Sequence, residues 1–84
     1  MLYREKIGLK LQAARKDKKL SQFEAANRIG IDRSVVSKIE TGRYTGSLKI
    51  YERYLASMGY VLTVVTEEPQ LTDFDELSEI FKDD

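Results

Sequence analysis

The chain has 84 residues and a mass of 9.7 kDa, which allows one small domain and a short tail. It contains no Cys and no His, which excludes disulfides, thiolate metal sites and the usual general base of enzymes. We therefore expect a protein that is not an enzyme and that needs neither a metal nor another cofactor. No apolar run approaches the roughly 20 residues of a membrane helix. The first residues also lack the apolar core of a signal peptide, so we expect a cytoplasmic protein without a membrane partner.

The charges divide the chain into two parts of opposite sign. Residues 1–60 carry 13 Lys and Arg against 6 Asp and Glu, which gives a net charge of +7. Residues 61–84 carry 1 Lys against 8 Asp and Glu, which gives a net charge of −7. This asymmetry is typical of a body that binds a polyanion and an acidic tail that does not.

The first predicted helix runs from about Tyr3 to Lys18. Within it, Ile7, Leu11 and Ala14 recur at helical spacing, as expected of a core-facing stripe. The Lys residues that gather at its end are favoured there, because cations interact well with the C-terminal end of a helix dipole.

Two short helices follow with only three residues between them. Ser21 and Glu24 form the Ser-x-x-Glu pattern of a capping box, which opens a helix that ends at Gly30. Asp32 is an N-cap candidate for the next helix, which stops at Thr41 and Gly42. So short a connection favours a sharp helix-turn-helix over a long antiparallel hairpin.

The fourth predicted helix begins after Ser47 and ends at Gly59. Its apolar residues are spaced to share one face. They are Leu48, Tyr51, Leu55 and Met58. We expect Tyr51 and Tyr54 to lie in the core or in a dimer surface, not on a nucleic-acid stacking platform.

Residues 60–65 are dense in β-branched and aromatic residues and predict a strand. A lone strand leaves its backbone polar groups unpaired, so it needs a partner strand. The same strand of a second copy supplies one, which predicts a homodimer. The alternative is an irregular apolar linker. The candidate dimerisation residues are Tyr60, Val61, Leu62, Thr63, Val64 and Val65.

The acidic end of the chain, residues 67–84, supports two interpretations. Its composition is that of a disordered, solubilising tail. Its apolar residues nevertheless recur at a spacing of three to four, which is typical of a helix that folds on a partner. We therefore divide the chain into a body over residues 1–59, a dimerising strand over residues 60–66 and this tail.

Residues 20–42, LSQFEAANRIGIDRSVVSKIETG, resemble the Xre / phage repressor–Cro family of helix-turn-helix regulators. The resemblance extends from about Ile7 to Gly59 without a gap. It implies an all-α, lambda-repressor-like domain of four to five helices. Two residues depart from the family pattern, since Ala25 replaces the usual Leu and Phe23 replaces a polar residue. Phe23 either refills the core from another angle or is exposed.

The resemblance implies a sequence-specific repressor that binds double-stranded DNA with its second short helix in the major groove. Arg33 and Lys38 can donate to guanine, Val35 can meet a thymine methyl group, and Ser is less selective. By resemblance, Gln22 contacts a phosphate at a helix N-terminus, and the loop after the reading helix grips the DNA backbone. The candidate DNA-binding residues are Ser21, Gln22, Arg33, Ser34, Val35, Ser37, Lys38, Arg43 and Tyr44.

Simpler interpretations exist for these residues. The helix pair would also suit a helical bundle that binds no DNA. Arg33 and Lys38 would also suit a plain solvated face of a helix. The Tyr44 side chain could simply cover its own loop. Family repressors often pair an Arg of the first helix with a Glu that ends the reading helix. Arg15 and Glu40 stand at these positions, so the resemblance implies a structural ion pair between them.

A dimer would present two reading helices about 34 Å apart to a palindromic operator. The ending SLKIYERYLASMGYVLTVV also resembles the antitoxins of toxin–antitoxin operons, above all those paired with a kinase-type toxin. This implies an autoregulating antitoxin, with a protein toxin as a candidate partner of residues 67–84. The alternative is a protein-interaction module that holds a toxin or another regulator through its acidic tail, with DNA binding secondary.

Overall fold

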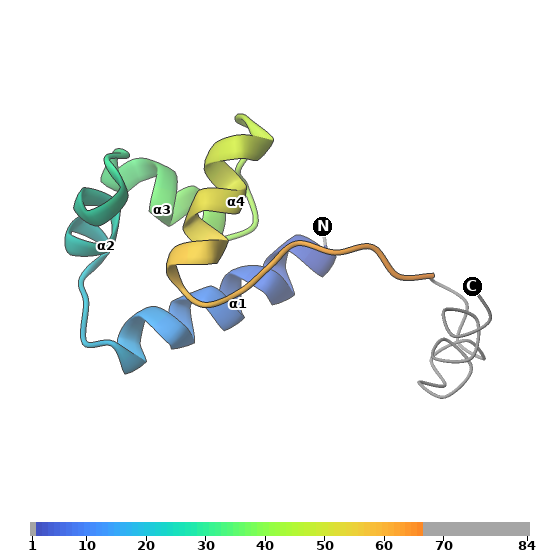
Figure 1. Ribbon diagram of the computed structural model, residues 1–84, viewed down its shortest axis with the longest axis horizontal. Helices are drawn as coiled ribbons and strands as arrows, with labels where there is room; N and C mark the ends of the chain where they lie inside the picture. Colours follow the sequence, from blue (N-terminus) through green and yellow to red (C-terminus); the bar gives the residue numbers. More distant parts are fainter. Residues whose placement is uncertain (1, 67–84) are drawn as a thin grey trace, which may run out of the picture.

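Four helices make up most of residues 2–66, the part of the chain that the computed structural model describes (Figure 1). Helix α3 packs against both α1 and α2, and α2 also contacts α4. In Figure 1 the long helix α1 runs along one side, and the three shorter helices lie on the other. The prediction of an all-α helix-turn-helix domain is confirmed. The helices are α1 (Leu2–Asp17), α2 (Gln22–Ile29), α3 (Arg33–Glu40) and α4 (Leu48–Ser57).

The ends of α2 follow the signals in the sequence. Ser21 Oγ accepts a hydrogen bond from the Glu24 backbone N–H at 3.0 Å, and Glu24 Oε1 accepts one from the Ser21 N–H at 2.8 Å. This is the predicted capping box. Gly30 closes the helix in the left-handed region at φ +71°, which a residue with a side chain adopts only with strain.

The N-terminus of α3 differs in detail from the prediction. Asp32 has the extended backbone of an N-cap residue, but its side chain makes no capping hydrogen bond. The carboxylate instead accepts a hydrogen bond from Ser34 Oγ. This bond is the main reason that the pKa of Asp32 lies below its usual value.

The core forms between the four helices. Its fully buried large side chains are Leu11, Val36, Ile39 and Tyr54. Of the four apolar residues expected to share one face of α4, Tyr51, Leu55 and Met58 are buried, whereas Leu48 is 60% exposed. Leu48 is the first residue of α4, and that end of the helix projects beyond the body in Figure 1.

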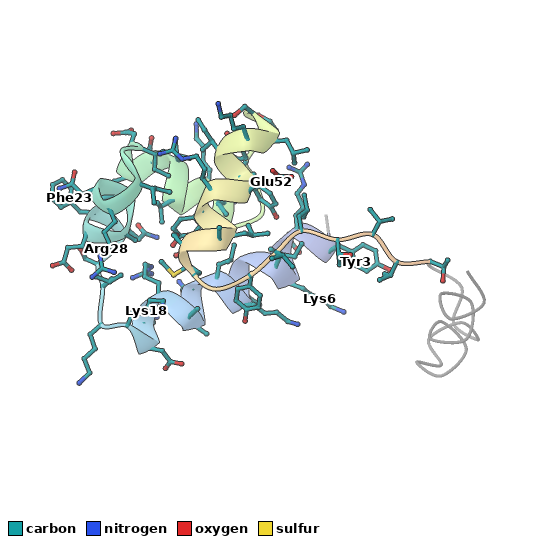
Figure 2. All side chains as sticks on the ribbon, in the orientation of Figure 1. Tyr3, Lys6, Lys18, Phe23, Arg28 and Glu52 are labelled. Atoms are coloured by element: carbon teal, nitrogen blue, oxygen red, sulfur yellow. The ribbon has the colours of Figure 1, made fainter. Side chains whose placement is uncertain are left out.

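Phe23 lies on the surface. Its side chain is 60% exposed and points away from α2 into solvent (Figure 2). Ala25, on the inner face of the same helix, is 1% exposed. Phe23 therefore does not compensate in the core for the small side chain of Ala25, which decides between the two possibilities that the sequence leaves open.

Helix α1 lies close against the C-terminal end of α3 at Gly8. A Cβ atom at this position would lie 2.9 Å from the carbonyl oxygen of Ile39 and closer still to that of Glu40. Such contacts with backbone atoms cannot be relieved by a rotamer change. Only glycine therefore allows α1 to cross the C-terminal end of α3 at this distance.

Residues 60–66 have no regular secondary structure, so the strand predicted over residues 60–65 is wrong for the single chain. A strand is held by backbone hydrogen bonds to a neighbouring strand, and no strand occurs among residues 2–66 to provide them. The segment instead runs beside α1 and borders an apolar groove of about 410 Å³ with Ile7, Lys10 and Leu11. The predicted tail, residues 67–84, lies outside the described residues.

Candidate nucleic-acid interface

Helix α3 turns its polar side chains away from the core. Val36 and Ile39 are buried, whereas Arg33, Ser34 and Lys38 are exposed. This follows from helical geometry, since apolar residues three apart share a stripe and residues on the opposite side of the helix face solvent. The outer face of α3 thus carries two cations and a hydroxyl group on a short, well-anchored helix.

Three other candidate residues are either partly buried or already hydrogen-bonded within the protein. Val35 and Ser37 are half-buried. The hydroxyl of Ser21 is exposed but accepts the capping hydrogen bond of α2. Their side chains therefore offer less contact area than those of the exposed residues on α3.

Gln22, the first residue of α2, joins α3 at two points. Its Nε2 donates to Glu40 Oε1 at 3.1 Å, and its Oε1 accepts a hydrogen bond from Arg33 Nη1 at 3.2 Å. The structure thereby brings two candidate DNA contacts from neighbouring helices within hydrogen-bonding distance. Neither the spacing nor the composition of the sequence indicated this pair.

Glu40 is the point at which all four helices meet through polar atoms. Its Oε2 accepts hydrogen bonds from Arg15 Nε at 2.8 Å and from Tyr54 Oη at 2.7 Å. Its Oε1 accepts from Arg15 Nη2 and from Gln22 Nε2, both at 3.1 Å. A carboxylate has about four acceptor positions, so this buried group is fully satisfied.

These contacts shift the ionisation of the cluster. Burial by itself raises the pKa of Glu40, but the hydrogen bonds from Arg15, Tyr54 and Gln22 outweigh it and hold that pKa below its usual value. Burial and the hydrogen bond to Glu40 raise the pKa of the Tyr54 phenol. Glu40 is therefore ionised and Tyr54 protonated at neutral pH.

Tyr44 is the most buried of the candidate interface residues. Its side chain is 8% exposed, its hydroxyl donates to the Ser47 carbonyl at 3.0 Å, and its ring stacks on Tyr51 with centroids 6.0 Å apart. The ring therefore covers its own loop, which agrees with the simpler of the two interpretations given for Tyr44 above. Arg43, the preceding residue, is exposed and remains available for such a contact.

Two polar contacts that hold this region were not predicted. Arg4 Nη1 donates to the carbonyl of Tyr44, which ties the loop before α4 to the start of α1. Tyr54 donates to Glu40, whereas the sequence indicated only a place in the core or in a dimer surface. Neither contact has a local signal, because the partners are separated by 40 and 14 residues.

None of the helices in the described part of the chain combines the length and apolarity needed to cross a bilayer. Within the same residues, no group of three or more metal-ligating side chains comes together.

Comparison with known proteins places this geometry in a family. The model of the helix-turn-helix family matches residues 11–60, which include α2, α3 and α4. The "Immunity repressor protein" of Bacillus phage phi105 is 31% identical over 65 residues, which cover 77% of this chain and 45% of that protein. The "ImmF control region 10 kDa protein" of the same phage is 37% identical over 65 residues, covering 77% of this chain and 72% of that protein.

The fold itself recurs in a solved structure described as "Structure of HipA-HipB-O2-O3 complex". One chain of it superposes with a TM-score of 0.64 at 20% sequence identity, covering 77% of this chain and 92% of that chain. At this identity the likeness concerns the fold.

Proposed function

This chain belongs to the helix-turn-helix family of the Xre and phage-repressor type, and from that membership we propose that it is a sequence-specific repressor of transcription. In this proposal the protein binds double-stranded operator DNA in the cytoplasm and is not an enzyme. The observation that carries this proposal is the outer face of α3, where Arg33 and Lys38 are exposed on a body with a net charge of +7. A helix with such a face fits the major groove, where base edges present distinct donors and acceptors.

The proposed contacts fall into two kinds. Arg33 and Lys38 donate to base edges, with Ser34 beside them and with Val35 and Ser37 reaching in from half-buried positions. Gln22 and Arg43 bind phosphates, and the N-terminus of α2 with its cap at Ser21 favours the same negative charge. Tyr44 acts only indirectly, by holding the shape of the loop that presents Arg43.

We further propose that the repressor is a homodimer whose residues 60–65 pair across the two-fold axis. Val61 and Val64 are 83% and 94% exposed, whereas Tyr60 and Leu62 are about half as exposed. An exposed apolar segment with unpaired backbone groups is suited to pair with its own copy. Two subunits joined in this way would place their α3 helices about 34 Å apart on a palindromic site.

Control of its own operon as an antitoxin is the finer part of the proposal. It is supported by the resemblance of residues 47–65 to antitoxins and by the fold shared with a chain of the HipA–HipB complex. The partner would be a protein toxin bound in part through residues 67–84.

The second candidate function is a protein-interaction module that holds a toxin or another regulator through residues 67–84. The negative charge of that segment favours it, because a DNA duplex would repel the tail. Substitution of Arg33 and Lys38 by Ala would abolish operator binding and leave partner binding intact. Deletion of residues 67–84 would do the reverse.

The first experiment is a binding-site selection with the purified protein and a randomised duplex library at moderate salt. Enrichment of a palindrome with two half-sites about one helical turn apart is the expected result for a dimeric repressor. Weak, salt-sensitive binding without enrichment would contradict sequence-specific repression and favour the interaction module.

A further inference from the structure

We propose that Glu40, a core residue that does not touch DNA, positions the Gln22–Arg33 pair and thereby sets how sharply Arg33 discriminates between bases. This inference rests on the proposed function and adds a positioning residue to it. Its basis is a continuous chain of hydrogen bonds from Glu40 Oε1 through the Gln22 amide to the Arg33 guanidinium, with distances of 3.1 Å and 3.2 Å.

The orientation of the Gln22 amide is fixed by the chemistry of its two neighbours. An ionised carboxylate can only accept hydrogen bonds, and a guanidinium can only donate them. The amide nitrogen must therefore face Glu40 and the amide oxygen must face Arg33. The opposite orientation would set oxygen against oxygen and N–H against N–H. One N–H of the amide and four N–H groups of Arg33 remain for DNA.

Glu40 is the rigid end of this chain of bonds. It is 5% exposed, and its other three hydrogen bonds come from Arg15 and Tyr54 on α1 and α4. Gln22 is half-buried and Arg33 is exposed. The buried Glu40 therefore restrains the Gln22 side chain, and Gln22 in turn restrains Arg33 at the surface. An exposed Arg loses much rotamer freedom when it is ordered on binding, and a side chain that is already held loses less.

Gln22 and Glu40 thus help to determine specificity at a base that neither of them reads. Removing this chain of hydrogen bonds, the relay from Glu40 through Gln22, leaves Arg33 free to adopt other rotamers and to donate to other acceptors. The affinity for the preferred base then falls more than the affinity for the other bases. We expect the discrimination at this base pair to fall by about two- to tenfold, as estimated for the freedom of one rotamer-rich side chain.

The test uses the full chain and the operator found by selection, with each base pair of one half-site substituted in turn. Gln22→Leu removes the relay at nearly constant size, and Glu40→Gln replaces the carboxylate that orients it. Tyr54→Phe is the matched control, because it removes a hydrogen bond from the same carboxylate at Oε2 and leaves the bond between Oε1 and Gln22 in place. Arg33→Ala identifies the base pair that Arg33 reads. The measured quantity is the ratio of affinities for preferred and substituted bases, which loss of stability alone does not change.

The expected result is a reduced ratio at the Arg33 base pair in Gln22→Leu and Glu40→Gln, with the ratio retained in Tyr54→Phe. In the Arg33→Ala background, Gln22→Leu should have no further effect on this ratio. If Glu40→Gln does not fold, as monitored by circular dichroism, Gln22→Leu on the half-buried N-terminus of α2 still tests the link through which Glu40 would act on Arg33.

Two results would overturn the inference and leave the proposed function standing. One is a uniform loss of affinity in Gln22→Leu with unchanged ratios, which is the behaviour of a plain phosphate contact. The other is a change of ratio in Gln22→Leu that persists without Arg33, which would mean that Gln22 reads the base itself. If the unmodified protein selects no sequence, the proposed function and the inference fail together.

Discussion

Arg15 and Glu40 form a buried ion pair across 25 residues of sequence, with Arg15 Nε 2.8 Å from Glu40 Oε2. The side chains are 8% and 1% exposed. Arg15 also donates to the Leu20 carbonyl at 2.8 Å, so it holds the segment that leads into α2. The pair therefore joins the long helix α1 to the end of the reading helix α3, and Arg15 also joins α1 to the segment just before α2.

Loss of one partner should destabilise the protein more than loss of a neutral contact. We expect Arg15→Ala to lower the free energy of unfolding by about 3–5 kcal/mol, because it leaves the Glu40 carboxylate buried and unpaired. The free energy of unfolding of a small domain is only about 5–15 kcal/mol, so this variant would be marginally stable. Tyr54→Phe, which removes one hydrogen bond to a charged group, should cost about 1.5–3 kcal/mol.

Urea unfolding followed by circular dichroism measures both changes. The control is Lys18→Ala, on an exposed side chain near the end of α1 (Figure 2), which we expect to change the free energy by less than about 0.5 kcal/mol. A cost for Arg15→Ala no larger than that of the control would contradict the structural role of the pair.

Stability should depend on pH at the two ends of the range. The pKa of Glu40 is lower in the folded protein than its ordinary value of 4.5, so its stabilisation is complete above that pH and is lost as the pH falls further. The pKa of Tyr54 is raised, so its contribution is lost as the pH rises above the ordinary value of 10.0. Because the chain has no His, we expect little change in between.

Thermal unfolding midpoints measured from pH 2 to pH 11 test this profile. Glu40→Gln should flatten the acid limb, whereas Glu24→Gln, at an exposed capping box, should change it less. An unchanged acid limb in Glu40→Gln would assign the acid sensitivity to other carboxyl groups.

Gly8→Ala should destabilise the protein although alanine is the better helix former. Helix propensity alone predicts a gain of about 1 kcal/mol at this position in α1. The added Cβ would overlap the carbonyl oxygens of Ile39 and Glu40, and overpacking of this kind costs about 1–3 kcal/mol. We therefore expect a net loss, measured by urea unfolding. The control is the reverse change at an exposed position of the same helix, Ala13→Gly, which should lower the free energy of unfolding only by the difference in helix propensity. A Gly8→Ala variant that is more stable than the unmodified protein would refute the close approach of the two helices.

A charge at Val64 should separate the proposed dimer without unfolding the subunit. Val64 is 94% exposed in the single chain, so Val64→Asp removes no intramolecular core contact. Sedimentation equilibrium should give a monomer for this variant and a dimer for the unmodified protein. Phe23→Ser removes an exposed aromatic residue from α2 and should leave the dimer intact (Figure 2). A dimer that survives Val64→Asp would place the main interface elsewhere.

Arg43→Ala should weaken operator binding uniformly across sequences. One fewer phosphate contact lowers the slope of log K against log salt concentration by about 1 and leaves base preference unchanged. Fluorescence anisotropy at several salt concentrations measures the slope. Lys6→Ala, on α1, is a matched removal of one positive charge and should leave the slope nearly unchanged. Equal slopes for both variants would argue against a phosphate contact by Arg43.

Local signals in the sequence determined where the helices begin and end. The capping box of Ser21 and Glu24, the left-handed Gly30 and the cap at Ser47 act within a few residues of themselves, so they can be recognised without a structure. The same holds for the helix-turn-helix spacing and for the polar outer face of α3, which follow from helical periodicity.

Apart from the Arg15–Glu40 ion pair, which the family resemblance implied, the tertiary structure decided which side chains meet and which are covered. It placed Phe23 on the surface, turned Tyr44 into its own loop, left residues 60–66 without a strand, and brought Gln22 between Glu40 and Arg33. The reason is that burial and side-chain pairing depend on residues far apart in the chain. A carboxylate that accepts hydrogen bonds from three other helices has no local signature, because no segment of the sequence contains all of its partners.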